Sequence, residues 1–157
     1  MTELAIGDPA PDFSVPTDGG GQISLSDLKG KIVVLYFYPK DDTPGCTNEA
    51  VAFTQLRSDF DTANAVIIGA SKDSVQKHDK FKAKHDLNVT LAADEDGSLV
   101  ESYGVWVEKN MYGRKYMGIE RATFVINQKG QIAHIWRKVK VKGHVETVLE
   151  AVQALKT

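Results

Sequence analysis

Hydrophobic residues in this chain fall into short unbroken runs separated by segments with helical spacing. The run Ile32–Tyr38 contains no charged residue, which is typical of a strand buried on both faces of a sheet. The run Val66–Ser71 has the same character, and the segment Thr47–Phe60 between the two runs repeats its apolar positions with the period of a helix. The pattern therefore begins as a strand, a helix and a second buried strand.

The rest of the pattern alternates helices and strands and then turns back on itself. We expect a helix from Ser74 to about His85, a strand Thr90–Ala92, a short helix Leu99–Tyr103, an aromatic loop Val105–Gly118, a strand Ala122–Ile126, a hairpin turn Asn127–Gly130, a strand Gln131–Val139 and a helix from about Gly143 to Leu155. The segment before Ser24 is expected to be extended chain with a turn at Gly19–Gly21. This order predicts an α/β fold with a central mixed β-sheet flanked by helices, in a single domain spanning residues 1–157.

Composition and charge narrow the classes of function. Hydrophobic residues make up 42% of the 157 residues, charged residues make up 25%, and the formal net charge is −2. A chain of this kind can bury its own core, and nothing in it indicates disorder, a nucleic-acid partner or an anionic membrane surface. The basic stretch Arg137–Lys142 alternates charge with valine, which fits an exposed strand end better than a polyanion site.

The cysteine count and the first residues point to a compartment. One cysteine cannot form an internal disulfide, so a reducing compartment is expected. The stretch Met1–Asp8 carries neither a basic leader nor an apolar segment of signal-peptide length. No run approaches the roughly 20 apolar residues of a membrane span. We therefore expect a cytoplasmic protein with no membrane partner.

The single cysteine, Cys46, stands where a reactive thiol is expected. Pro39 ends the first buried strand, and Cys46 follows in the first turn of the next helix. Thr43 suits the N-cap and Pro44 the first helical position, so the sulfur would lie near unpaired backbone N–H groups with the Thr43 hydroxyl within reach. A helix N-terminus favours an anion, and the thiolate is the reactive form of cysteine. The alternative is a buried cysteine that acts only as a small hydrophobic residue.

Three further residues bear on this thiol. Arg121 starts a predicted strand, and its guanidinium beside the sulfur would favour the thiolate; the alternative is a surface ion pair. Glu49 lies one helical turn after Cys46 and could fix an arginine by a bidentate contact, the alternative being a solvated charge. Gly45 is unfavourable in this helix, because a glycine inside a helix lowers its stability by about 0.5–1 kcal/mol relative to alanine.

No pattern in the sequence predicts a metal or a cofactor. The histidines lack the paired spacing of zinc ligands, and no second cysteine joins them, so we expect packing or surface roles. These residues are His78, His85, His134 and His144. The large side chains of the aromatic loop could wall a pocket or could equally form part of the core. They are Trp106, Met111, Tyr112 and Met117.

The spacing Pro39-X-X-X-Thr43-X-X-Cys46, joined to Glu49 and the distant Arg121, is the most specific pattern in the chain. In this pattern the chain resembles the peroxiredoxins, which are thiol peroxidases with a thioredoxin-like fold. It is most similar to the bacterioferritin comigratory protein, or peroxiredoxin Q, subgroup, in a one-cysteine form. The resemblance covers nearly the whole chain, and the stretches that carry it are Gly7–Phe13, Tyr36–Thr47, Lys109–Arg121 and Val139–Val145.

The resemblance implies a role for each residue of the site. Cys46 would be the peroxidatic cysteine, whose thiolate attacks hydrogen peroxide or an organic hydroperoxide and becomes a sulfenic acid. Pro39, Thr43 and Arg121 would shape the site that binds and polarises the peroxide. Glu49 would support Arg121.

Reduction of the sulfenic acid then needs another molecule. Many members of the subgroup carry a resolving cysteine five residues after the first, at the position of Val51 here, and others carry one on the next helix, where this chain has none. We therefore expect an external thiol reductant, namely thioredoxin, glutaredoxin or a small thiol, or else Cys46 of a second chain, and a monomer or weak dimer. Gly45, next to Pro44, would ease unwinding of the first helical turn so that oxidised Cys46 reaches its reductant.

Two other functions fit the chain less well. A thioredoxin-like disulfide reductase needs a Cys-X-X-Cys motif, whereas Gly45 and Thr47 flank an isolated cysteine. A non-catalytic redox sensor, in which oxidation of Cys46 switches a partner, would react with peroxide slowly and without turnover.

Overall fold

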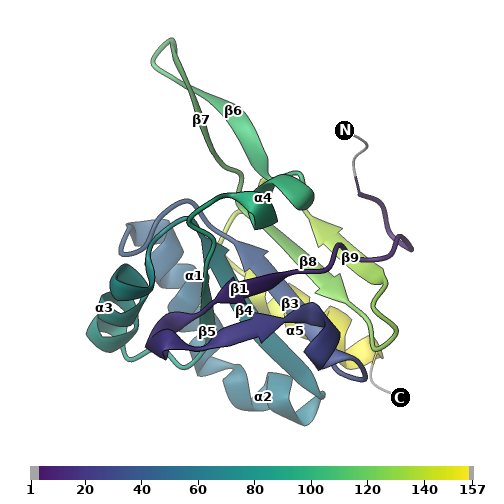
Figure 1. Cartoon of the computed structure of the whole chain (residues 1–157). Helices are drawn as coiled ribbons and strands as arrows, with labels where there is room; N and C mark the ends of the chain where they lie inside the picture. Colours follow the sequence, from purple (N-terminus) through teal and green to yellow (C-terminus); the bar gives the residue numbers. More distant parts are fainter. Residues whose placement is uncertain (1–3, 156–157) are drawn as a thin grey trace.

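A mixed five-stranded sheet forms the centre of the molecule in the computed structural model, which describes residues 4–155 (Figure 1). The strands, in their order across the sheet, are β5 (Thr90–Ala93), β4 (Ala65–Ser71), β3 (Ile32–Phe37), β8 (Ala122–Ile126) and β9 (Ile132–Trp136). β3 pairs in parallel with β4, and β4 with β5, whereas β8 pairs antiparallel with both β3 and β9. The predicted mixed sheet is confirmed, and every side chain of its central strand β3 is buried.

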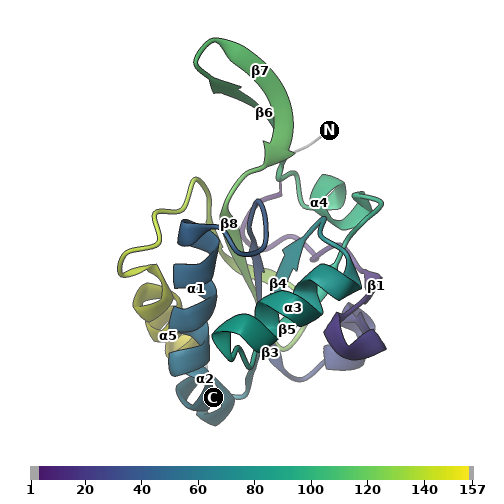
Figure 2. The same ribbon diagram turned by 90° about the vertical axis from the view of Figure 1, so that its left-hand side faces the viewer.

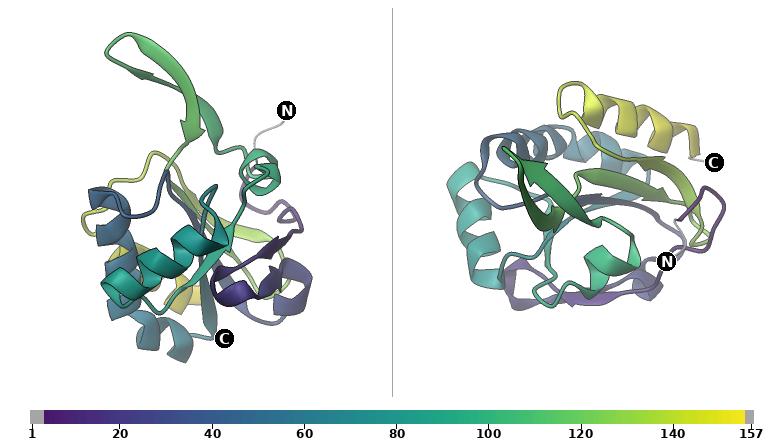
Figure 3. Two further views of the ribbon diagram at one scale, coloured as in Figure 1. Left: turned by 60° about the vertical axis from the view of Figure 1, so that its left-hand side comes forward. Right: turned by 90° about the horizontal axis from the view of Figure 1, so that it is seen from above.

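The side chains of β3 divide between two hydrophobic cores, one on each face of the sheet. Val34 and Tyr36 face a core covered by helices, and Val33 and Leu35 face the other core. The helices of the first face are α1 (Pro44–Gln55), α2 (Arg57–Thr62), α3 (Val75–His85) and α5 (His144–Leu155) (Figures 2 and 3). Because successive strand residues point to opposite faces, an unbroken apolar strand requires cover on both sides. None of the described helices is long and apolar enough to cross a membrane.

The second face of the sheet is covered by the N-terminal segment and a short helix. These elements are β1 (Ser14–Pro16), a 3₁₀ turn (Asp18–Gly20), β2 (Gln22–Ser24), a second 3₁₀ turn (Leu25–Leu28) and α4 (Ser98–Ser102). β1 and β2 form an antiparallel pair. Val15 of β1 and Leu99 of α4 join the core on this face. The extended opening segment is thus a small sheet of its own.

The prediction of an aromatic loop over Val105–Gly118 is wrong. This segment forms an antiparallel hairpin of β6 (Trp106–Met111) and β7 (Arg114–Ile119). Its two turn residues, Tyr112 and Gly113, both have positive φ, 54° and 79°, as a two-residue hairpin turn requires. Tyrosine in place of the usual asparagine or aspartate concealed the turn. The hairpin has little apolar alternation because most of it is exposed.

The helix predicted over Thr47–Phe60 is two helices. It breaks at Leu56, which separates α1 from α2. The break allows Phe53 of α1 and Phe60 of α2 to pack in one core with their ring centres 5.7 Å apart. The helical spacing of the two phenylalanines can be read from the sequence. The break between the two helices cannot, because it depends on how both rings pack in the core.

The last strand is shorter than predicted, which changes the interpretation of the basic stretch. β9 ends at Trp136 instead of Val139, so the stretch Arg137–Lys142 is a loop rather than a strand end. Arg137 turns inward, where it donates to Glu120 Oε2 at 2.8 Å. The lysines of the stretch are exposed, as expected of a solvated segment.

Candidate active site

Cys46 lies at the end of β3 that also meets the start of β8. α1 begins at Pro44, so Cys46 belongs to the first turn of that helix. Phe37, the last residue of β3, is paired with Ala122, the first residue of β8. Arg121 directly precedes Ala122, and the antiparallel pairing therefore places it beside Cys46 although 75 residues separate the two in the sequence.

Arg121 joins the thiol to a buried carboxylate. Its Nη2 donates to Cys46 Sγ at 3.3 Å, and its Nη1 donates to Glu49 Oε1 at 2.8 Å. Burial lowers the pKa of Arg121, but the negative charges of Cys46 and Glu49 outweigh burial and raise this pKa above its ordinary value. A guanidinium thus contacts a sulfur that is only 1% exposed.

Glu49 holds Arg121 through one oxygen, so the expected bidentate contact is not formed. Its side chain is fully buried, and its Oε2 has no hydrogen-bond partner among the described residues. The hydroxyl of Tyr36 is also buried and has no hydrogen-bond partner within residues 4–155. Burial raises the pKa of Glu49 to about 7 against the opposing effect of Arg121. Near neutral pH the Glu49 carboxyl group is therefore a mixture of its charged and neutral forms.

Gly45 leaves room for the arginine. A Cβ at Gly45 would lie 3.1 Å from Arg121 Nη2, the atom that donates to Cys46. This separation is shorter than ordinary van der Waals contact, which is about 3.5–4.0 Å between carbon atoms. The structure thus gives Gly45 a packing role. Its expected role in unwinding the helix stays a prediction.

Thr43 has the backbone of an N-cap but does not cap α1 with its side chain. It is extended, with φ −98° and ψ 156°, and Pro44 takes the first helical position as predicted. The Thr43 hydroxyl donates to the carbonyl of Lys40 at 2.9 Å rather than contacting Cys46. The backbone N–H groups of Gly45 and Cys46 are therefore not occupied by Thr43 and can donate to a substrate oxygen.

A second polar cluster, missed by the sequence analysis, fixes the loop between β3 and α1. The ring of His78 is fully buried, with Nδ1 2.6 Å from Asp41 Oδ2 and Nε2 2.9 Å from the carbonyl of Ala92. Asp41 also accepts from the Tyr38 hydroxyl at 2.6 Å, and its N–H donates to Asp73 Oδ2 at 2.8 Å. We call these residues the His78 cluster.

The ring of His78 faces acceptors at both nitrogens, which is the environment of a charged imidazolium. Burial lowers the pKa of His78, but the hydrogen bond and charge of Asp41 outweigh burial and raise it above its ordinary value. The only signal in the sequence was a histidine on the same helix face as Phe81. Its partner Asp41 lies 37 residues away, and no local pattern joins them.

The other histidines take packing or surface positions, as expected. His144 is buried with Nε2 2.8 Å from the Thr123 hydroxyl, and burial together with the charge of Arg121 lowers its pKa to about 4. His85 contacts the exposed Asp42, and His134 stacks on Trp136. Across residues 4–155, no group of three or more His, Cys, Asp or Glu side chains is arranged to hold a metal ion.

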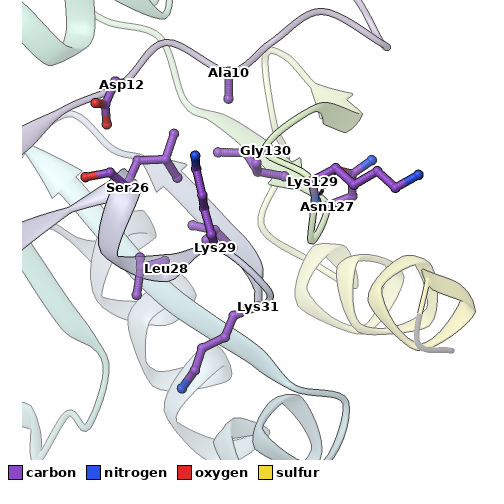
Figure 4. A pocket seen from close by; sticks show the side chains of 12 residues that line it. Ala10, Asp12, Ser26, Leu28, Lys29, Lys31, Asn127, Lys129 and Gly130 are labelled. Carbon is purple, nitrogen blue, oxygen red and sulfur yellow. Dashed lines mark hydrogen bonds between the residues drawn. The ribbon is translucent and has the colours of Figure 1, made fainter.

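Two hollows lie at opposite ends of β3. One, of about 450 Å³, adjoins the site and has Pro39, Trp106 and Met117 in its wall. The other, of about 260 Å³, lies at the start of β3 and is edged by three lysines. In Figure 4 these lysines, Lys29, Lys31 and Lys129, point in different directions and do not converge on one point. Of these two hollows, the one beside Pro39 includes a predicted site residue in its wall, whereas Cys46 itself is not part of that wall.

Comparison with known proteins agrees with this geometry. The model of the AhpC/TSA family matches residues 6–135. A putative peroxiredoxin bcp of Coxiella burnetii is 53% identical over 146 residues, covering 93% of this chain and 97% of the relative. Peroxiredoxin Bcp of Bacillus subtilis is 51% identical and covers 98% of this chain and 96% of the relative.

Solved structures give the same result. A structure of the bacterioferritin comigratory protein of Xanthomonas campestris, described in terms of its alkyl peroxide reduction activity, superposes with a TM-score of 0.90. It is 44% identical and covers 98% of both chains. The match confirms the predicted thioredoxin-like architecture. The chain therefore belongs to the AhpC/TSA family and is a peroxiredoxin, a thiol-dependent peroxidase.

Proposed function

We propose that Cys46 is the peroxidatic nucleophile of this peroxidase and that Arg121 holds it as a thiolate. The observation that carries the proposal is the 3.3 Å contact between Arg121 Nη2 and Cys46 Sγ, made by a guanidinium whose other arm is anchored on Glu49. The chain offers no other thiol. Gly45 supports the arrangement by allowing the guanidinium to approach the first turn of α1.

The first half of the reaction oxidises the sulfur. The Cys46 thiolate attacks one oxygen of the hydroperoxide, the S–O bond forms as the O–O bond breaks, and the other oxygen leaves as hydroxide or alkoxide and takes a proton to become water or an alcohol. Ionisation of the thiol alone accounts for at most about a thirtyfold gain in rate at neutral pH. Arg121 and the N–H groups of Gly45 and Cys46 supply the rest, because donors already held in place stabilise the charge that develops on oxygen.

Thr43 and the prolines orient the peroxide. The proton of the Thr43 hydroxyl is directed to Lys40, so the lone pairs of its oxygen are available to accept the O–H of a hydroperoxide. Pro39 and Pro44 border the site and restrict its backbone. The apolar part of the hollow beside Pro39 suits an organic group, so the proposed substrates are hydrogen peroxide and organic hydroperoxides.

The second half of the reaction returns the sulfur to the thiol. Because Cys46 is the sole cysteine, the sulfenic acid condenses with an external thiol, releasing water and forming a mixed disulfide. A second external thiol then displaces Cys46 and leaves as part of the product disulfide. Thioredoxin, glutaredoxin and small thiols are the candidate reductants, and the protein is proposed to act as a monomer or weak dimer. The cytoplasm is the proposed compartment, because the cycle needs a steady supply of thiols.

A single-turnover experiment tests the proposal. Reduced protein is mixed anaerobically with one equivalent of hydrogen peroxide or cumene hydroperoxide, followed by a sulfenic-acid trapping reagent and whole-protein mass measurement. One trapped adduct on Cys46 is expected, and Cys46→Ser should give none. A Cys46 that stays unmodified after minutes at micromolar peroxide would contradict the proposed role.

A further inference from the structure

The β6–β7 hairpin carries nearly all the exposed large hydrophobic side chains of the described chain. Of the five such residues, only Ile6 lies elsewhere. The other four are Met111 (56% exposed), Tyr112 (101%), Tyr116 (42%) and Met117 (49%). Exposed apolar side chains that gather in one place indicate a surface that contacts another molecule.

The foot of the hairpin lies beside the candidate active site, and the rest of the hairpin extends outward from it. It projects from the end of the domain at which α1 begins (Figures 1 and 2). Its foot, including Trp106 and Met117, lines one hollow together with Pro39, and β7 ends two residues before Arg121. A molecule that binds along the hairpin as far as its foot is therefore held next to the residues that activate Cys46.

This end of the molecule is also basic, although the whole chain has a net charge of −2. Among the described residues, six cations of this region form no ion pair. Lys40 lies in the loop after β3, Lys109 and Arg114 lie on the hairpin, and Lys138, Lys140 and Lys142 lie in the loop after β9. The last three belong to the loop that a hydrogen bond from Val139 N–H to the Arg121 carbonyl holds beside the site. The nearby acidic residues form ion pairs with other cations: Asp42 pairs with Lys84, Glu108 with Lys115 and Glu120 with Arg137.

We propose that the hairpin and these cations form the docking surface for a protein dithiol whose reactive cysteine is surrounded by apolar side chains and an acidic rim. The inference rests on the proposed function, in which the Cys46 sulfenic acid is reduced from outside. The apolar hairpin matches the centre of such a partner, and the unpaired cations match its rim, so charge complementarity favours this occupant over a second copy of the chain, which would bring like charges together.

Docking also answers a problem of access. Cys46 is 1% exposed, so a thiol in solution meets the sulfur only when the first turn of α1 opens. A partner held on the hairpin is present at high effective concentration when that opening occurs. One of its thiols then forms the mixed disulfide with release of water, and its second thiol completes the two-electron reduction by releasing the Cys46 thiol. A small thiol needs two separate encounters for the same result.

The test compares protein and small-thiol reductants on matched variants. Met111→Ser/Tyr112→Ser removes exposed apolar groups, Arg114→Glu/Lys140→Glu reverses two unpaired charges, and Ile6→Ser is the control at the exposed site outside the hairpin. Reduction of oxidised Cys46 is measured with thioredoxin, with glutaredoxin and with dithiothreitol. For the better protein reductant we expect kcat/KM to fall at least tenfold in the apolar variant. In the charge variant it should fall at least threefold at low salt, and the difference should diminish at high salt.

The remaining readouts separate the possible failures. The rate with dithiothreitol and the single-turnover rate with peroxide should stay within about twofold in every variant, because none of the changed residues touches the reacting atoms. Unchanged protein reduction in both variants overturns the docking surface while leaving the proposed function intact. Absence of peroxide-dependent oxidation of Cys46 overturns the proposed function instead. If the apolar variant abolishes dimerisation in sedimentation but leaves protein reduction unchanged, the surface belongs to a second copy and the proposal is wrong.

Discussion

Two buried polar clusters flank the loop that leads into α1, and they differ in how completely they are paired. In the His78 cluster each buried side-chain polar atom has a hydrogen-bond partner. In the Arg121 cluster, formed by Arg121, Cys46 and Glu49, the Oε2 atom of Glu49 has no partner in the part of the chain that the structure describes. Fully paired polar groups hold a backbone in one geometry, whereas burial of an unpaired carboxyl oxygen is costly and raises the pKa of its group. The first cluster is thus a support for the loop, and the second is where charge changes during the reaction.

The largest effect is expected from breaking the His78 cluster. His78→Leu leaves the buried carboxylate of Asp41 without its cation, so the free energy of unfolding should fall by about 3–5 kcal/mol. Urea unfolding of the reduced protein at pH 6 measures this loss. Asp41→Asn/His78→Leu removes the charge as well and should recover part of it. Asp41→Asn alone is measured as well, and a double variant destabilised by the sum of the two single effects would show that the pair is not coupled.

The stabilisation that His78 contributes should also depend on pH, in a direction that its pKa determines. The pKa of His78 is raised in the folded protein, so its stabilising contribution is complete below the ordinary pKa of 6.5 and is lost as the pH rises through the higher folded value. The difference in unfolding free energy between the natural protein and His78→Leu should therefore be larger at pH 6 than at pH 9. A difference that grows with pH would mean that the ring is neutral in the folded state.

The Arg121 cluster should respond to pH through Glu49. Its folded pKa of about 7 lies above the ordinary 4.5, so a contribution to stability that is complete below pH 4.5 is lost as the pH rises to 7. This shift corresponds to about 3 kcal/mol. Glu49→Gln cannot ionise, and its unfolding free energy should decline less between pH 5 and 8 than that of the natural protein. Parallel curves for the two proteins would show that Glu49 is fully ionised throughout.

Replacing the arginine should affect chemistry more than stability. Arg121→Lys keeps the charge but cannot contact Cys46 and Glu49 with two arms, so the rate of peroxide attack should fall roughly 100-fold. Stopped-flow single turnover measures it. Arg57→Lys, at an exposed ion pair on α2, is the matched control and should react at the natural rate. A loss below about threefold would remove Arg121 from the proposed set of donors.

The smallest effect is expected at Gly45. The Cβ of Gly45→Ala would displace Arg121 Nη2 by a few tenths of an ångström, which should slow peroxide attack roughly threefold to tenfold. If the glycine serves mainly to unwind the helix, reduction by an external thiol should slow more than attack. Measuring both steps in this one variant decides between the packing role and the unwinding role.

The sequence was informative wherever one local pattern determines one local structure. The uncharged run Ile32–Tyr38 requires cover on both faces and so predicts the central strand. Thr43 and Pro44 mark a helix start, which places Cys46 in its first turn. The hairpin was missed because Tyr112 and Gly113 form the turn without the usual asparagine or aspartate and because no core imposes alternation on its exposed strands.

What the sequence by itself determined is the fold class and the position of the single thiol at the start of a helix. Only the tertiary structure decided which charges meet that thiol. The register between β3 and β8 brings Arg121 into contact with Cys46, although the two are 75 residues apart in the sequence. The packing of α3 likewise brings His78 into contact with Asp41, 37 residues away. Contacts of this kind have no local signature, because the side chains are brought together by the pairing of strands and the burial of helix faces rather than by their spacing in the chain.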